Sequence, residues 1–135
     1  PFLWCKFVWC IFDFSAAGRR EGTTFGRNDK GLVTYDRRIR KDAFYFYKAN
    51  WNRKEKVLYI ASKRCRNRTD SLTEIQAFSN CGEAELFVNG SSMGKCSPDE
   101  VCVVTWKNVP LQAGENLVLV RASGVSDSCI LCLDE

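Results

Sequence analysis

An amide and an ammonium group, those of Asn28 and Lys30, are the side chains of this 135-residue sequence best placed to hold one ligand together. They flank Asp29 in a stretch punctuated by glycines, and in an extended loop side chains two residues apart point to the same side. An amide both donates and accepts hydrogen bonds, and an ammonium group pairs well with a carboxylate. The spacing indicates a binding site for a polar ligand, and the alternative is that Lys30 is a solvated loop charge.

The apolar run 2–14 carries two further candidates. Trp9 offers a flat indole face that can cover an apolar ligand surface and exclude water, and the alternative is a tryptophan of the core. Asp13 is a carboxylate between two phenylalanines, and such groups are rarely buried without a partner. We expect Asp13 to pair with Arg19 or Arg20, and we favour this structural role over a catalytic one.

The composition excludes several kinds of site. The sequence contains no histidine, which removes Ser-His-Asp and Cys-His catalysis and the commonest zinc ligand. It contains eight cysteines, at positions 5, 10, 65, 81, 96, 102, 129 and 132. We expect free thiols, because the chain is rich in core-type residues and several cysteines lie in apolar runs. Cys129 and Cys132 have the CxxC spacing but no second pair, so we expect no metal and no cofactor.

The net charge of +4 is unevenly spread, because the basic residues concentrate before residue 69. Between Arg37 and Arg68 they alternate with Tyr45, Tyr47 and Trp51, a mixture that also occurs in nucleic-acid-binding proteins. We favour a solvated helix face and a surface that meets an acidic neighbouring domain. No apolar run reaches the roughly 20 residues that span a bilayer. We therefore expect neither nucleic acid nor a membrane as a partner.

The first fifty residues have the pattern of one β/α unit. The run 2–14 is nearly continuously apolar, which is typical of a strand buried on both faces of a parallel sheet. The stretch 15–35 is a long loop rich in glycine and charge, and loops of this length are usually functional. Asp42 can cap a helix that reaches Trp51. One such unit cannot bury its own strand, so it requires a larger sheet or barrel around it.

The remainder is a series of short β-type runs without helices between them. The expected strands are Val57–Ser62, Leu72–Ser79, Ala84–Val88, Val101–Trp106, Leu117–Ala122 and Cys129–Leu133. Asn89-Gly90 is a strong hairpin signal, because both residues tolerate positive φ. Trp106 lies in an apolar run, and we expect it in the core. The pattern predicts an antiparallel sandwich over 55–135, which follows a first domain over 1–52.

Longer motifs point to a family. They are FVWCIFDF, GRNDKGLVTYDRR and KDAFYFYKANW in the first domain, and EAELFVNGSSMGK and VTWKNVPLQAGEN in the second. In this order they resemble the C-terminal part of family 2 glycoside hydrolases, in particular bacterial β-galactosidases. The resemblance implies a mostly β fragment: the last strand (2–14) and last helix (42–51) of a (β/α)8 barrel, then an immunoglobulin-like β-sandwich. It also implies a bacterial protein of the periplasm or the cytoplasm.

The resemblance implies a retaining hydrolysis by two glutamates, which we expect upstream of Pro1. None of the eight glutamates of the chain stands in such a motif, so we expect no catalytic residue here. The family similarity gives Trp9 the floor of the sugar subsite and places Asn28 and Lys30 in the same pocket. In related β-glucuronidases an Asn-x-Lys at this place grips the sugar carboxylate, whereas in galactosidase-like sequences the lysine more often meets a hydroxyl or an acid.

The expected function is therefore that of a C-terminal part of a β-galactosidase, whose partners are a terminal β-galactoside and the rest of the parent chain. A β-glucuronide or galacturonide is the alternative sugar. The alternative function is a non-catalytic carbohydrate-binding or structural β-sandwich module. Exposed aromatic rings on one sheet face would favour that module.

Overall fold

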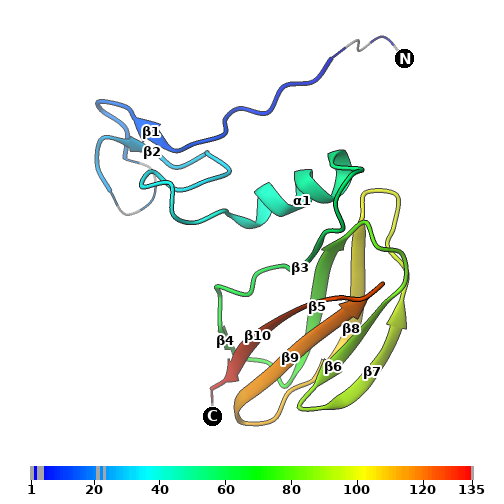
Figure 1. Cartoon of the computed structure of the whole chain (residues 1–135). Helices are drawn as coiled ribbons and strands as arrows, with labels where there is room; N and C mark the ends of the chain where they lie inside the picture. The colour runs from blue at the N-terminus through cyan, green and yellow to red at the C-terminus, as the bar shows by residue number, and fades with distance from the viewer. Residues whose placement is uncertain (1, 3–4, 21, 23, 135) are drawn as a thin grey trace. The chain divides into compact units, whose positions relative to one another are not determined.

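The computed structural model describes residues 2, 5–20, 22 and 24–134 (Figure 1). The chain divides into two compact units, Pro1–Phe44 and Tyr45–Glu135. The division falls inside the helix α1 (Asp42–Trp51), which begins at the expected residue with an acidic side chain in its first turn. The expected bounds of the two domains, 1–52 and 55–135, and the assignment of the first to a barrel stay predictions. None of the described helices is long and apolar enough to cross a membrane.

The second unit is a β-sandwich, as the sequence predicts. One sheet has the strand order β4 (Asn67–Arg68), β10 (Val125–Leu133), β9 (Gly114–Ala122), β6 (Ala84–Val88) and β7 (Ser91–Cys96). The other has the order β3 (Leu58–Ile60), β5 (Leu72–Ser79) and β8 (Val103–Pro110). Neighbouring strands are antiparallel, except that β4 runs parallel to β10. The fold class is therefore mostly β.

The core of the sandwich lies between the two sheets. It is built from the alternate residues that face inward along each strand. The main core residues are Ile60, Ile75, Ala77, Leu86, Val88, Val104, Trp106, Val118, Val120 and Leu131. Trp106 is 3% exposed, and its indole N–H on β8 donates to the carbonyl of Gly94 on β7, at 3.1 Å. This hydrogen bond joins the two sheets and confirms Trp106 as a core residue.

Two tight hairpins set the register of the larger sheet. Asn89 and Gly90 have φ values of 50° and 84°, which is the geometry that the Asn-Gly pair predicts between β6 and β7. Ser123 and Gly124, with φ values of 45° and 80°, make the same kind of turn between β9 and β10. The strand β7 was not among the predicted strands, because its sequence SSMGKC lacks a clear alternation of apolar and polar residues.

Buried Asn116 ties the loops at one end of the sandwich together. It is fully buried, and its amide group donates to the carbonyls of Gln112 (2.7 Å) and Gly114 (3.0 Å). Its Oδ1 accepts hydrogen bonds from the Gln112 N–H (2.9 Å) and from the Asn89 side chain (3.0 Å). Asn89 in turn accepts from the Leu117 N–H at 2.8 Å. One side chain thus holds the β6–β7 turn against the β8–β9 loop.

Within the second unit, the helical residues from Tyr45 onward cover the outer face of the smaller sheet. The Tyr45 ring stacks on Tyr59 of β3, with centroids 3.7 Å apart and planes at 7°. The Phe46 ring meets Phe78 of β5 edge-on at 5.5 Å. Tyr59 and Phe78 are cross-strand partners, so the two contacts cover one continuous patch. The sequence prediction placed this helix with a barrel and did not foresee this packing.

The described residues of the run 2–14 do not form the continuous strand that the sequence predicts. Within the described residues of this run, a strand begins only at β1 (Phe14–Ser15), which pairs with β2 (Arg27–Asn28). Residues 10–13 make a short ladder with residues 32–33, through N–H···O bonds of 2.9–3.0 Å. Phe7 and Trp9 are 88% and 75% exposed. The reason is physical: a strand exists only where a neighbour takes its backbone hydrogen bonds, and the described residues offer none beside residues 5–9.

The eight cysteines are free, as expected. On β10, Cys129 packs against the core, whereas Cys132, three residues later, points to the opposite face. Burial, together with the nearby Asp127 carboxylate, raises the pKa of the Cys129 thiol to about 11. The described residues contain no cluster of side chains that could hold a metal ion.

We expect the substitution Asn116→Ala to lower the free energy of unfolding by about 2–3 kcal/mol, because it removes a fully buried amide and its four hydrogen bonds to Gln112, Gly114 and Asn89. Urea unfolding followed by circular dichroism measures this change. Asn67→Ala is the matched control, since Asn67 is exposed, and it should change stability by less than about 0.5 kcal/mol. Equal losses in the two variants would contradict the role given to Asn116.

We expect iodoacetamide to modify the exposed Cys65 readily at pH 8 and to spare Cys129 in the folded protein. Raising a thiol pKa from 9.0 to about 11 lowers its thiolate fraction at pH 8 roughly a hundredfold, and the thiolate is the reactive form. Mass spectrometry of tryptic peptides measures both sites in one sample. Alkylation of both at the same rate, before unfolding, would show that the Cys129 environment is wrongly described.

Candidate functional site

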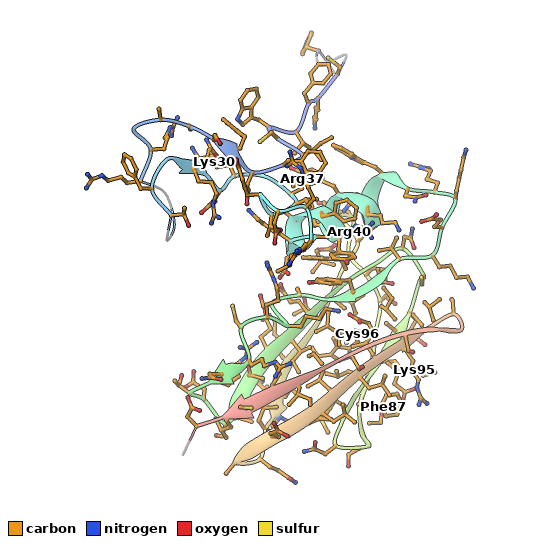
Figure 2. The ribbon with its side chains drawn as sticks, turned by 60° about the vertical axis from the view of Figure 1, so that its left-hand side comes forward. Lys30, Arg37, Arg40, Phe87, Lys95 and Cys96 are labelled. Atoms are coloured by element: carbon orange, nitrogen blue, oxygen red, sulfur yellow. The ribbon has the colours of Figure 1, made fainter. Side chains whose placement is uncertain are left out.

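The Asn28–Lys30 motif forms a compact turn at the end of β2. Asn28 is 3% exposed, and its Oδ1 accepts the backbone N–H of Lys30 at 3.0 Å. This is the local turn that asparagine side chains favour, and it occupies the amide oxygen. The Lys30 side chain is exposed on the loop (Figure 2). Of the predicted pair, Asn28 shapes the loop and Lys30 is the group that a ligand can reach from solvent.

Trp9 lies close to the same hairpin. Its ring meets the Phe14 ring edge-on, with centroids 6.2 Å apart, and the Trp9–Cys10 peptide bond is cis. Phe14 is the cross-strand partner of Asn28 in the β1–β2 pair. The structure therefore connects two of the three predicted site residues through a single phenylalanine. The indole is exposed and not enclosed in a core, so a ligand can reach its face; its role as the floor of a sugar subsite stays a prediction.

A buried ion pair supports this loop. The carboxylate of Asp13, which is 2% exposed, lies 2.7 Å from the ammonium group of Lys41 and accepts the Gly31 N–H at 2.9 Å. Lys41 also donates to the carbonyl of Asp29 at 2.7 Å. The expected pairing of Asp13 is confirmed, but the expected partners, Arg19 and Arg20, are wrong. Lys41 is 28 positions away, and no local pattern in the sequence marks it.

Gly31 is required by the close approach of two chain segments. A Cβ on Gly31 would lie 2.2 Å from the backbone N of Asp13 and from the carbonyl carbon of Phe12. No side chain fits at that distance, and the obstacle is backbone that cannot rotate away. The glycine after Lys30 therefore lets the loop reach the buried carboxylate. The sequence showed this glycine only as one of several in the loop.

The charges around the motif are largely engaged within the loop. The guanidinium of Arg27 hydrogen-bonds the carboxylate of Asp29 and lowers the pKa of that carboxyl, so the acid between Asn28 and Lys30 has its own partner. The guanidinium of Arg37 lies 3.8 Å from the centre of the Phe12 ring. Figure 2 shows Lys30 and Arg37 on this first unit. The arrangement leaves the loop basic and can bind an anionic or polyhydroxylated ligand.

The described residues of the first unit include no glutamate. A retaining hydrolysis uses two carboxylic acids about 5 Å apart, usually glutamates. The described glutamates are residues 55, 74, 83, 85, 100 and 115, all of which lie in the second unit. Asp13 and Asp29 are held by Lys41 and Arg27. That no catalytic residue lies in this chain stays a prediction.

The sandwich does not offer an aromatic platform for sugars. No aromatic ring of residues 55–134 is among the exposed large side chains, and Trp106 is buried. A hollow of about 390 Å³ on the larger sheet is lined by charged groups that include Glu83, Glu85, Lys95 and Arg121. The guanidinium of Arg121 lies over the neighbouring Phe87 ring, 5.3 Å from the centre of that ring. These features do not favour a free-standing carbohydrate-binding module.

The chain is similar to part of several proteins that are named as glycosidases. Residues 70–128, which run from the start of β5 into β10, match the family model described as "Domain of unknown function (DUF4982)". A β-glucuronidase of Bacteroides fragilis is 56% identical over 124 residues, which is 92% of this chain and 18% of that protein. The chain thus spans less than a fifth of this relative.

Solved structures agree. The FMN-binding β-glucuronidase of Faecalibacterium prausnitzii L2-6 is 39% identical with a TM-score of 0.85, over 93% of this chain and 19% of that one. A protein of Bacteroides fragilis that is provisionally named a β-galactosidase is 30% identical with a TM-score of 0.87, over 93% of this chain and 19% of that one. Both similarities extend over nearly all of this chain, from the candidate loop through the sandwich. Residues 70–128 thus match the DUF4982 domain, and the chain as a whole is similar to part of enzymes named β-glucuronidase and β-galactosidase, which bears out the resemblance to family 2 glycoside hydrolases.

Proposed function

We propose that this chain forms the substrate-binding wall and the adjoining β-sandwich of a retaining β-glycosidase, and that the sugar is a β-glucuronide. The observation that carries the proposal is the turn at Asn28, which presents the exposed ammonium group of Lys30 from a rigidly anchored loop. The first part of the proposal rests on the homology to glycosidases over nearly the whole chain. The second part rests on the chemistry of the loop.

In this proposal, another part of the enzyme supplies the catalytic residues and this chain supplies binding residues. Two glutamates from another part of the enzyme act as nucleophile and as acid/base, with a covalent glycosyl-enzyme intermediate. Trp9 covers the apolar C–H face of the sugar ring, and Lys30 meets its charged or polar edge. Binding groups of this kind raise the rate by orienting the anomeric carbon towards the reacting carboxylates.

A carboxylate is the ligand group that suits Lys30 best. A charge-assisted hydrogen bond between an ammonium and a carboxylate is roughly twice as strong as one between neutral groups. Asp29 is engaged by Arg27. The relatives named β-glucuronidase agree with this sugar. A β-galactoside, the first expectation from the sequence, is the alternative, and one structural neighbour has that name.

The substitution Lys30→Met in the complete enzyme should lower kcat/KM for an aryl β-glucuronide by roughly tenfold to a hundredfold, because it removes a charged hydrogen bond. The same change should affect an aryl β-galactoside much less, since a galactoside has no carboxylate to lose. Steady-state kinetics with both substrates measures the effect. Lys54→Met, another exposed lysine, is the matched control and should leave both activities near the wild-type values.

The outcomes separate the two sugars and the two parts of the proposal. The β-galactosidase alternative would be favoured if the wild-type enzyme prefers the galactoside and Lys30→Met keeps the wild-type activity on both substrates. A folded complete protein without activity on either sugar would contradict the glycosidase proposal itself.

A further inference from the structure

We propose that Lys41 is a positioning residue for sugar-acid recognition, which fixes Lys30 through the buried carboxylate of Asp13. Lys41 lies outside the Asn28–Lys30 motif, and no pattern in the sequence marks it for a role in binding. The inference rests on the proposed function and deepens it, because it names the device that sets the specificity of the same loop.

The backbone on both sides of Lys30 is tied to one ion pair. Before Lys30, the carbonyl of Asp29 accepts a hydrogen bond from the Lys41 ammonium at 2.7 Å. After Lys30, the N–H of Gly31 donates to Oδ1 of Asp13 at 2.9 Å. The same Oδ1 lies 2.7 Å from the Lys41 ammonium, so both hydrogen bonds end on the same ion pair. The ion pair therefore clamps the peptide groups that flank Lys30.

The clamp is itself anchored. The backbone N–H of Lys41 donates to the carbonyl of Leu32 at 2.8 Å, and the N–H of Asp13 donates to the carbonyl of Val33 at 3.0 Å. Asp13 is 2% exposed, so its bonds are made out of water, where charged hydrogen bonds are strong. Removing the lysine would leave a buried carboxylate with the Gly31 N–H as its remaining side-chain hydrogen bond.

Lys41 acts through Lys30 and not on the sugar itself. Its ammonium group already donates to the Asp13 carboxylate and to the Asp29 carbonyl, and its side chain is only 21% exposed. A sugar carboxylate would have to compete with an established buried pair. Lys30 is exposed, and the turn at Asn28 fixes its N–H. The two lysines therefore have separate roles: Lys30 binds the ligand, and Lys41 fixes the position of Lys30.

This arrangement matters for the reaction because recognition of a sugar acid depends on position. A displacement of about 1 Å in a binding group can cost roughly a hundredfold in rate. If the clamp opens, Lys30 keeps its charge but loses its fixed place relative to the sugar carboxylate. The loss therefore falls on the substrate with the carboxylate, and a neutral substrate in the same pocket is affected less.

The test compares Lys41→Met, Lys30→Met, the double variant and Lys41→Arg in the complete enzyme. The readout is the ratio of kcat/KM for an aryl β-glucuronide to that for an aryl β-galactoside. We expect Lys41→Met to lower this ratio roughly tenfold or more, and Lys41→Arg, which keeps a cation beside Asp13, to restore part of it. Because Lys41 acts through Lys30, the double variant should match Lys30→Met alone. Lys48→Met, which breaks the 2.8 Å pair with Glu55, is the control and should leave the ratio unchanged.

A second measurement does not depend on activity. Hydrogen–deuterium exchange should show faster exchange over residues 29–33 in Lys41→Met, by roughly tenfold or more, and no change there in Lys48→Met. Losses that multiply in the double variant, or unchanged exchange over residues 29–33, would overturn the positioning role. A wild-type enzyme without a preference for glucuronides would instead overturn the proposed sugar, and the exchange result would still decide the role of Lys41.

Discussion

The first unit depends on one constraint: the carboxylate of Asp13 is removed from water and must be paired there. A buried charge without partners costs several kcal/mol, so the surrounding chain has to bring donors to it. Lys41 and Gly31 supply them, from segments 28 and 18 positions further along the chain. The path of the loop between these residues, including the turn at Asn28 and the exposed Lys30, follows from that requirement. The candidate binding site is thus a consequence of how the fold satisfies a charge.

In the sandwich, two polar side chains also hold separate segments together through hydrogen bonds. Asn116 is neutral and fully buried, and it joins two loops through four hydrogen bonds. Asp127 on β10 accepts the Ile60 N–H of β3 at 2.7 Å and pairs with Lys63 at 2.8 Å. This carboxylate links strands of opposite sheets. Polar groups fix the edges and loops, and the apolar core between the sheets supplies most of the burial.

Much of the sandwich could be predicted from its sequence because its signals are local. Alternation of apolar and polar residues located β5 and β6 with their observed bounds, and Asn89-Gly90 located the hairpin that follows. The strand β7 has no such alternation, and its pairing is decided by the turn before it and the partner beside it. The described residues of the run 2–14 do not form the continuous strand that was expected. Its composition favours a buried strand, but only neighbouring backbone can make it one.

The sequence by itself determined the residue types and the family motifs. From these it identified Trp9, Asn28 and Lys30 as candidate site residues. It also excluded histidine chemistry and predicted the core position of Trp106. Only the tertiary structure decided which candidate is exposed and which one shapes the loop. It alone showed that Lys41 is the ion-pair partner of Asp13. The reason is the range of the interactions. Hydrophobic periodicity and turn preferences act over a few residues and can be found along the chain. A buried ion pair joins positions 13 and 41, and its partner is chosen by packing in three dimensions.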